Sequence, residues 1–318
     1  MSCYKFKELH YKDPIFKKVE ATYIIHLEGN GRLKDIESQL QRFHPTETVY
    51  IVFNQGYKKC EKDAYVDKPP LDLVDAFFTV FKDAEQKGYE HVLVLEDDFI
   101  FDDEILDEKH PAEMERFLME HKDQNFVYYL GVLPFLQLST FGYHNRVFMC
   151  AGTHAAIYNN VFIKNLVHNV PQNIVNDWDN YTGLHCTQYK YHKSLCYQIF
   201  PQTENKKYWG HESDVVRFIT EYINIPLFNY LELNKAVYPG YNIFEYASKY
   251  IIWFIIITTI LLNICLFFFV RNNYKWLKKH WQYYIFMALG VIVGYPILII
   301  IIFILSIIVG KMYHNSIK

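Results

Sequence analysis

The stretch "HVLVLEDDFIFDD", residues 91–103, contains an apolar run that ends in three adjacent acids, Glu96, Asp97 and Asp98. Four consecutive apolar residues bounded by polar ones indicate a strand that is buried on both faces. Such strands belong to parallel sheets that helices cover, in which ligands bind beyond the carboxyl ends of the strands. The three acids stand at such an end, so the stretch predicts both a fold class and the position of a site.

The segments around this stretch alternate between strand and helix patterns. Apolar runs predict strands at residues 21–27, 48–53, 91–96 and 125–132. Apolar residues at helical spacing predict helices at residues 33–40, 69–88 and 111–122. We therefore expect an α/β sandwich with a mostly parallel sheet, formed by a domain that spans residues 1–248.

Charge divides the chain into two parts. All 35 acidic residues and 25 of the 32 basic residues precede Lys249, whereas the remaining residues carry seven basic side chains and no acid. An acidic domain is poorly suited to binding nucleic acid through phosphate contacts, so we expect no nucleic-acid partner. If it binds a phosphorylated ligand, a cation must supply the positive charge.

Two uncharged apolar stretches dominate the second part, at residues 250–270 and 283–309. A helix of about 20 apolar residues spans a bilayer core. In the second stretch, Pro296 predicts a kink, and Gly290 with Gly294 permits close helix packing. We predict that residues 249–318 form a membrane anchor, a transmembrane helical hairpin in contact with membrane lipid.

Two features of the sequence give opposite predictions for the side of the membrane on which the domain lies. The connector "RNNYKWLKKHWQ", residues 271–282, contains four basic residues, and the positive-inside rule would place it in the cytosol and the domain across the membrane. The first 18 residues, however, contain no apolar signal-peptide core, and the six cysteines form no CxxC pair or compact disulfide pattern. We therefore expect a multi-pass membrane protein with a cytosolic domain.

The acid cluster has a chemical interpretation and a simpler one. Side chains alternate along an extended chain, so Glu96 and Asp98 would share a face and could bridge Mn²⁺ or Mg²⁺, while Asp97 would point elsewhere. The simpler interpretation is a solvated loop. Phosphoryl transfer by an aspartate nucleophile is less favoured because the first acid is Glu96, and no P-loop, GxSxG or HExxH motif is present.

Four blocks in order resemble glycosyltransferase family 25, the lipooligosaccharide galactosyltransferase group, and its large-virus relatives. The blocks are "TYIIHLEGNGRLKDI", "VLVLEDDFIF", "CAGTHAAIYNN" and "VNDWDN", within residues 21–218. The resemblance implies a GT-A-like (Rossmann-like) αβα sandwich that uses a nucleotide-diphosphate sugar as donor. It also implies Mn²⁺ or Mg²⁺ as the cofactor.

The resemblance assigns roles at the first two blocks. His26, Leu27 and Arg32 match the segment that meets the nucleotide, although His26 replaces the usual Asn and residues 28–31 are an insertion. The acidic motif is intact and implies metal binding by Glu96 and Asp98. It also implies contact of Asp97 with the ribose and diphosphate of the donor.

The resemblance assigns further roles later in the chain. Asp177 matches the base that would deprotonate the acceptor hydroxyl, with Asp179 as the second candidate, although an acid there could simply cap a helix. His211 is the candidate third metal ligand. Its rivals are His154 and His185, and a basic pair, Lys206 and Lys207, could meet the diphosphate.

These expectations combine into one function and one alternative. The chain would be a membrane-anchored, metal-dependent glycosyltransferase that moves a sugar, with inversion, to a hydroxyl of a glycan, glycolipid or glycoprotein acceptor. The alternative is a catalytically inactive domain of this type that serves as a membrane-bound interaction or sugar-binding module.

Overall fold

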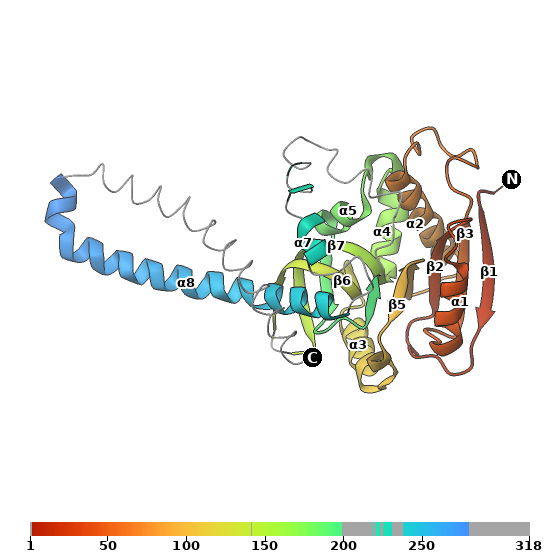
Figure 1. Cartoon of the computed structure of the whole chain (residues 1–318), viewed down its shortest axis with the longest axis horizontal. Helices are drawn as coiled ribbons and strands as arrows, with labels where there is room; N and C mark the ends of the chain where they lie inside the picture. Colours follow the sequence, from red (N-terminus) through yellow and green to blue (C-terminus); the bar gives the residue numbers. More distant parts are fainter. Residues whose placement is uncertain are drawn as a thin grey trace.

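The computed structural model describes residues 2–140, 142–198, 218, 221–222, 225–230 and 238–279 (Figure 1). His211, Lys206, Lys207 and the predicted span at 283–309 lie outside these residues. Within them the chain forms a sheet with helices on both faces, so the predicted α/β class is confirmed.

The sheet has seven strands in the order β1-β3-β2-β4-β7-β6-β8. The strands are β1 (Tyr4–His10), β2 (Ala21–Leu27), β3 (Thr48–Asn54), β4 (His91–Glu96), β6 (Phe126–Leu138), β7 (His144–Asn159) and β8 (Thr187–Tyr191). Parallel pairings join β3 to β2, β2 to β4 and β6 to β8, whereas β1 and β7 run antiparallel to their neighbours. Five of the seven strands therefore point the same way, in agreement with a mostly parallel sheet.

Helices cover both faces of the sheet, and each face has its own apolar core. The helices are α1 (Leu33–Arg42), α2 (Pro69–Gln86), α3 (Lys109–Glu120), α4 (Asn160–Asn169), α5 (Trp178–His185) and α7 (Ile225–Tyr230), with 3₁₀ turns η1 (Asp103–Leu106) and η2 (Gln172–Ile174). Core residues of α1 and α3 pack with Leu93 and Leu95 of β4. Core residues of α2, α4 and α5 pack with Val92 and Val94. This double burial explains why β4 is apolar at every position between His91 and its acid.

Helix α2 forms where the sequence predicted it. Prolines suit its first turn because the N–H groups of a first turn have no acceptor within the helix, and Pro69 and Pro70 occupy that turn. Phe77 and Phe81 are buried on the sheet side. Gly88 follows the helix with a φ of 73°, a left-handed conformation that favours glycine.

The antiparallel pairings of β1 and β7 were not predicted. β7 lies between β4 and β6, and it pairs with β6 in a long, irregular hairpin with several register shifts. β6 therefore continues to Leu138, beyond the predicted end at 132. Strand β1, with an exposed polar face, lies at the sheet edge.

A second, two-stranded sheet lies beside the acid turn. Strand β5 (Phe99–Phe101), directly after the acids, pairs with β9 (Cys196–Gln198). The close approach of β9 to β6 requires a glycine, because a Cβ on Gly131 would lie 1.9 Å from the carbonyl oxygen of Cys196. The β5–β9 pairing sets Gln198 opposite Phe99 and so brings Gln198 next to the acids.

Cys3 and Cys60 form a disulfide bond. The sequence shows no compact disulfide pattern, and this pair was not predicted. The two residues are 57 positions apart in the sequence, and the antiparallel pairing of β1 with β3 brings them together. Spacing alone cannot show such a pair. Cys150, Cys186, Cys196 and Cys265 are free thiols.

A single helix, α8 (Tyr238–Lys279), contains both the predicted domain boundary at 248 and the predicted span at 250–270. Its beginning is bound to the domain by polar contacts. The buried Glu245 carboxylate accepts hydrogen bonds from Lys190 Nζ (2.5 Å) and from the Ser194 N–H (3.1 Å) and Oγ (2.8 Å). Trp253 Nε1 donates to the Ser139 carbonyl (3.1 Å).

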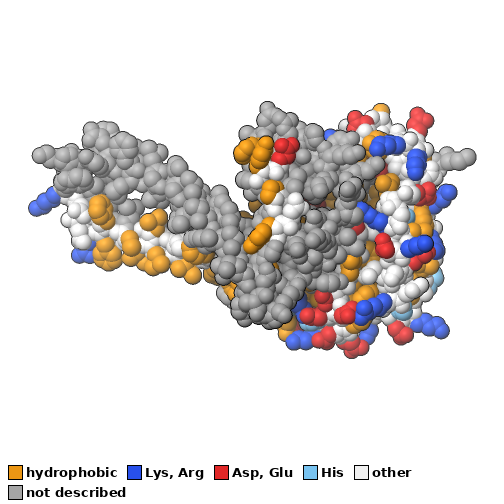
Figure 2. Space-filling view, viewed as in Figure 1, with side chains coloured by type: hydrophobic (Ala, Val, Ile, Leu, Met, Phe, Trp, Pro, Cys, Tyr) orange, Lys and Arg blue, Asp and Glu red, His pale blue; other side chains and the backbone are white. Residues whose placement is uncertain are grey.

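Beyond these contacts α8 projects away from the domain, with exposed apolar side chains along it (Figures 1 and 2). They include Ile256, Ile257, Ile260, Leu261, Ile264, Phe268 and Phe269. The window Glu245–Leu262, with mean hydropathy 1.4, is long and apolar enough to cross a membrane, and only 18% of it is buried. Among the described helices α8 alone has this property, so the second helix of the predicted hairpin is not tested.

Candidate functional site

The connections of β2 and β4 reverse the strand order at the carboxyl ends of these adjacent strands. The chain leaves β2 through α1 on one face of the sheet to reach β3, and returns through α2 on the other face to reach β4 on the opposite side of β2. Ligands of open α/β sheets bind at such a reversal of strand order. The acid turn after β4 and the loop after β2 lie at this point.

Asp97 is the centre of a polar network that holds the β2–α1 loop (residues 28–32). Its carboxylate accepts hydrogen bonds from the Leu27 N–H (3.1 Å), Asn30 Nδ2 (2.5 Å) and Arg32 NH1 (2.5 Å), and lies 3.2 Å from His26 Nδ1. Burial opposes ionisation, but the hydrogen bond with His26 and the charge of Arg32 lower the pKa of Asp97. Asp97 is therefore a fixed anion.

All four residues predicted to contact the nucleotide, His26, Leu27, Arg32 and Asp97, belong to this network. Their polar contacts in it are with one another. His26 and Asp97 are 3% and 8% exposed, so their polar atoms are largely satisfied inside the protein. Asn30 was missed because it lies in the insertion that departs from the family pattern. A signal was present: Gly29 and Gly31 flank it with φ angles of 87° and 84°, as a tightly wound loop requires.

Asp98 is buried beside Gln198. The Gln198 amide Nε2 donates to both carboxylate oxygens (3.2 and 3.1 Å), and Arg32 NH1 lies 3.4 Å from Oδ2. Burial nevertheless raises the pKa of Asp98 to about 7. Gln198 was missed because only the β5–β9 pairing places it here. Its buried Oε1 has no hydrogen-bond partner within the described part of the chain.

Glu96 is half-buried at the end of β4, and its carboxylate accepts no hydrogen bond from a described residue. Burial raises its pKa, and the charges of Asp98, Asp179 and Asp97 raise it further. The chain turns at residues 97–98, so the predicted alternation along an extended strand does not apply. Glu96 and Asp98 are two residues apart in the chain, and the charge of Asp98 raises the pKa of Glu96.

Helix α5 adds a further acid to this cluster. Asp179, in its first turn, accepts hydrogen bonds from the Gly152 N–H (2.8 Å) and from Thr153 Oγ1 (2.6 Å). Burial and the charge of Asp177 raise the pKa of Asp179. Asp177 caps α5, since its carboxylate accepts the Asn180 N–H at 2.9 Å. The intervening Trp178 is buried and stacks on Phe77 at 4.2 Å, which is a packing role.

The two described histidine candidates, His154 and His185, do not join the acids. His154 is fully buried, with Nδ1 2.7 Å from the Gly152 carbonyl and Nε2 3.2 Å from the Cys196 carbonyl. Burial lowers its pKa to about 4. His185 is exposed at the end of α5. In the described ranges, no three His, Cys, Asp or Glu side chains are grouped to hold a metal ion.

The acids nevertheless suit a cation that needs only two protein ligands. Asp97 does not fit, because its oxygens already meet four partners. Glu96 has no donor among the described residues, and its raised pKa reflects burial first and the negative charge of the neighbouring acids second. Mg²⁺ is often bound by one or two carboxylates together with substrate phosphates, and Glu96 with Asp98 fits that pattern.

Gln198→Met should lower the free energy of unfolding by about 1–2 kcal/mol at pH 8.5, where Asp98 is ionised and loses its buried donor. At pH 5 the loss should be smaller, because a pKa of about 7 leaves Asp98 protonated. Chemical denaturation at the two pH values measures both. Gln188→Met is a matched control, since buried Gln188 donates to the neutral Tyr129 hydroxyl. Equal losses at both pH values for Gln198→Met would contradict the assigned contact.

The described residues thus define a mixed α/β protein with an acidic site where the strand order reverses. No family model matches the chain, and no curated protein matches it.

Solved structures give only weak similarities. The crystal structure of A197 from STIV has a TM-score of 0.36 at 15% identity, covering 58% of this chain and 87% of that one. Mannose-1-phosphate geranyltransferase from Thermus thermophilus has a TM-score of 0.30 at 11% identity, with coverages of 55% and 73%. Apo-UDP-glucose pyrophosphorylase has a TM-score of 0.26 at 12% identity, with coverages of 54% and 72%. None of these values supports an inference about function.

Proposed function

We propose that the chain is a glycosyltransferase that uses a nucleotide-diphosphate sugar and transfers the sugar with inversion to an acceptor hydroxyl. One observation supports this most directly. Three carboxylates with raised pKa values, Glu96, Asp98 and Asp179, gather where the strand order of the sheet reverses. Clustered acids with raised pKa values destabilise a fold, and such groups are characteristic of functional sites.

The polar network of Asp97 has a role in this proposal. It fixes the β2–α1 loop, and with it His26, Leu27 and Arg32, at the entrance where the nucleotide would bind. Glu96 and Asp98 would hold Mn²⁺ or Mg²⁺, which when bound neutralises charge on the leaving diphosphate. Arg32, 3.4 Å from Asp98, would orient the phosphates from the other side.

The proposed base is Asp179, ahead of Asp177. A general base needs a fixed carboxylate whose pKa is raised toward the working pH. Gly152 and Thr153 fix Asp179, burial raises its pKa, and its charge affects Glu96. Asp177 is engaged as the cap of α5. Asp179 would accept the proton of the acceptor hydroxyl as that oxygen attacks the sugar.

Membrane anchoring by α8 is part of the proposal, supported by its exposed apolar side chains. Acceptors attached to lipid or to membrane proteins would suit it best. The expectation of a cytosolic domain rested partly on the cysteine pattern, and the Cys3–Cys60 disulfide removes that support. Protease protection of the domain in sealed vesicles determines the side.

The proposal predicts that the full-length protein, in detergent, retains at least one nucleotide sugar from a panel of UDP and GDP sugars when Mn²⁺ is present. Chelation should weaken this binding by at least about tenfold, because two carboxylates without their cation repel the diphosphate. Calorimetry measures the affinity, and mass spectrometry identifies the retained ligand. Binding of no member of the panel would refute the proposal.

The inactive-module alternative also has an observation in its favour. His26 and Arg32, the predicted nucleotide contacts, both interact with Asp97. A module would bind a sugar or a partner without turnover. Metal-dependent hydrolysis or transfer of the retained donor would exclude it.

A further inference from the structure

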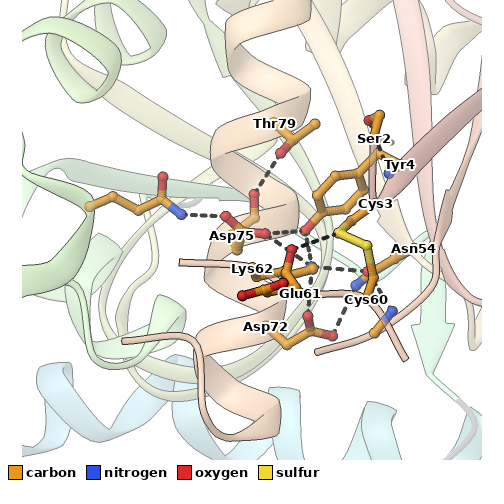
Figure 3. Close-up of polar contacts among 12 residues, drawn as sticks. Ser2, Cys3, Tyr4, Asn54, Cys60, Glu61, Lys62, Asp72, Asp75 and Thr79 are labelled. Atoms are coloured by element: carbon orange, nitrogen blue, oxygen red, sulfur yellow. Dashed lines mark hydrogen bonds and ion pairs between the residues drawn. A yellow bond between two sulfur atoms is a disulfide. The ribbon is translucent and has the colours of Figure 1, made fainter. Parts of the chain in front are cut away.

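The β3–α2 loop (residues 55–68) is attached to its surroundings at two neighbouring points. Cys60 is bonded to Cys3, at the start of the chain. Two residues later, the Lys62 ammonium lies 2.6 Å from Asp72 Oδ1 and 3.0 Å from Asp75 Oδ2, on the first turns of α2. Figure 3 shows the disulfide and this ion-pair cluster side by side.

Burial of Lys62 makes the second attachment specific. Its side chain is 3% exposed, and it also donates to Asn54 Oδ1 (3.0 Å) and to the Tyr4 hydroxyl. A buried ammonium is tolerated only where carboxylates and hydrogen bonds replace its water. The contacts of Lys62 with Asp72, Asp75, Asn54 and Tyr4 therefore fix the position of the loop at this point.

The loop packs against the β2–α1 loop of the site. Gly56 adopts a φ of 77°, and a Cβ on it would lie 3.0 Å from Leu27 Cδ1. The backbone N–H groups of Lys59 and Cys60 both donate to the Gly56 carbonyl (3.0 and 3.1 Å). One tight turn thus links the disulfide to the residue that precedes the β2–α1 loop.

Lys59 extends from this turn toward the site. Its Nζ lies 3.3 Å from the position that a Cβ on Gly29 would occupy, one residue before Asn30 in the Asp97 network. Lys59 is exposed, and no hydrogen bond or ion pair joins its side chain to another described residue. Among the described residues, the site beside it contains four carboxylates and only Arg32 as a fully charged basic group, so an anionic ligand meets little positive charge from these residues.

We propose that Lys59 is a phosphate-binding residue of this site and that the Cys3–Cys60 disulfide holds it in place. The assignment rests on the proposed use of a nucleotide diphosphate. A dithiol that reduces the disulfide breaks the S–S bond, leaves two cysteine thiols and becomes a cyclic disulfide itself. The turn then loses one attachment while Lys62 keeps the other, so binding weakens without being abolished.

The test measures the affinity of the full-length protein for UDP and GDP, with Mn²⁺, before and after treatment with dithiothreitol. Reduction should weaken binding about tenfold, the equivalent of one charged hydrogen bond. The double variant Cys3→Ser/Cys60→Ser should match the reduced protein and should not respond to dithiothreitol. In the oxidised protein, Lys59→Gln should weaken binding about tenfold, whereas Lys82→Gln, an exposed lysine of α2, should not.

Equal affinity before and after reduction, or an unchanged affinity in Lys59→Gln, overturns the proposal. If the oxidised wild-type protein binds neither nucleotide, the proposed function fails instead. Hydrogen–deuterium exchange of the unliganded protein then tests the disulfide separately. Reduction should accelerate exchange at residues 27–32 and 55–62, and unchanged exchange in both segments overturns the positioning role.

Discussion

Asp179→Asn is expected to lower the rate of sugar transfer by about 10²- to 10⁴-fold, the range that loss of a general base produces. The affinity for the donor should change little, because the asparagine side chain can still accept the Gly152 N–H and hold α5 against β7. Single-turnover transfer measured beside calorimetric donor binding separates the two effects.

Asp177→Asn distinguishes the two candidate bases. Asparagine caps helices as well as aspartate does, so α5 should remain intact. If Asp179 is the base, this variant keeps most of its transfer rate. A large loss in Asp177→Asn with a small one in Asp179→Asn would return the role to Asp177, as the sequence resemblance implies.

Asp98→Asn is expected to weaken Mn²⁺-dependent donor binding by at least about 100-fold, because it removes one of two proposed metal ligands. The same substitution should stabilise the metal-free fold at pH 8 by about 2 kcal/mol. The pKa rise from 3.8 to about 7 corresponds to roughly 4 kcal/mol, and the weaker bonds that an amide makes with Arg32 and Gln198 offset about half of it.

The pH dependence of this stabilisation has a definite sign. Below about pH 3 the carboxyl is protonated in both the folded and the unfolded chain, so the substitution gains nothing. As pH rises toward 7, the unfolded chain ionises first and the wild-type fold loses stability relative to the variant. Denaturation in chelator at pH 4, 6 and 8 measures the trend. Asp103→Asn, an exposed acid paired with Arg42, is the control and should stay within about 0.5 kcal/mol.

Much of the sheet could be predicted from sequence because burial on both faces makes a strand apolar throughout. The predicted strands at 21–27 and 91–96 coincide with β2 and β4. The apolar runs marked no strand at β1 or β7, because an edge strand and an irregular hairpin mix polar with apolar residues. The disulfide escaped for a related reason, since it depends on the pairing of β1 with β3.

The site was predictable only where its residues are adjacent in the sequence. Glu96, Asp97 and Asp98 stand together in the chain, but tertiary structure gives them different partners. Asp97 faces the β2–α1 loop, Asp98 meets Gln198 from β9, and Glu96 is influenced by Asp179 of α5. A sequence pattern shows that the three acids are adjacent, but it does not show which partner each side chain meets.

The buried ion pair between Lys190 and Glu245 has a mechanical consequence. It leaves no flexible tether between the domain and α8, because the helix runs without interruption from Tyr238 to Lys279. About 16 Å of helix separates Glu245 from Ile256, where the exposed aliphatic side chains begin. If α8 enters a bilayer there, the site keeps one height and one tilt above the lipid surface. The distance of an acceptor hydroxyl from the lipid surface, as well as its affinity for the site, would then determine whether the protein can modify it.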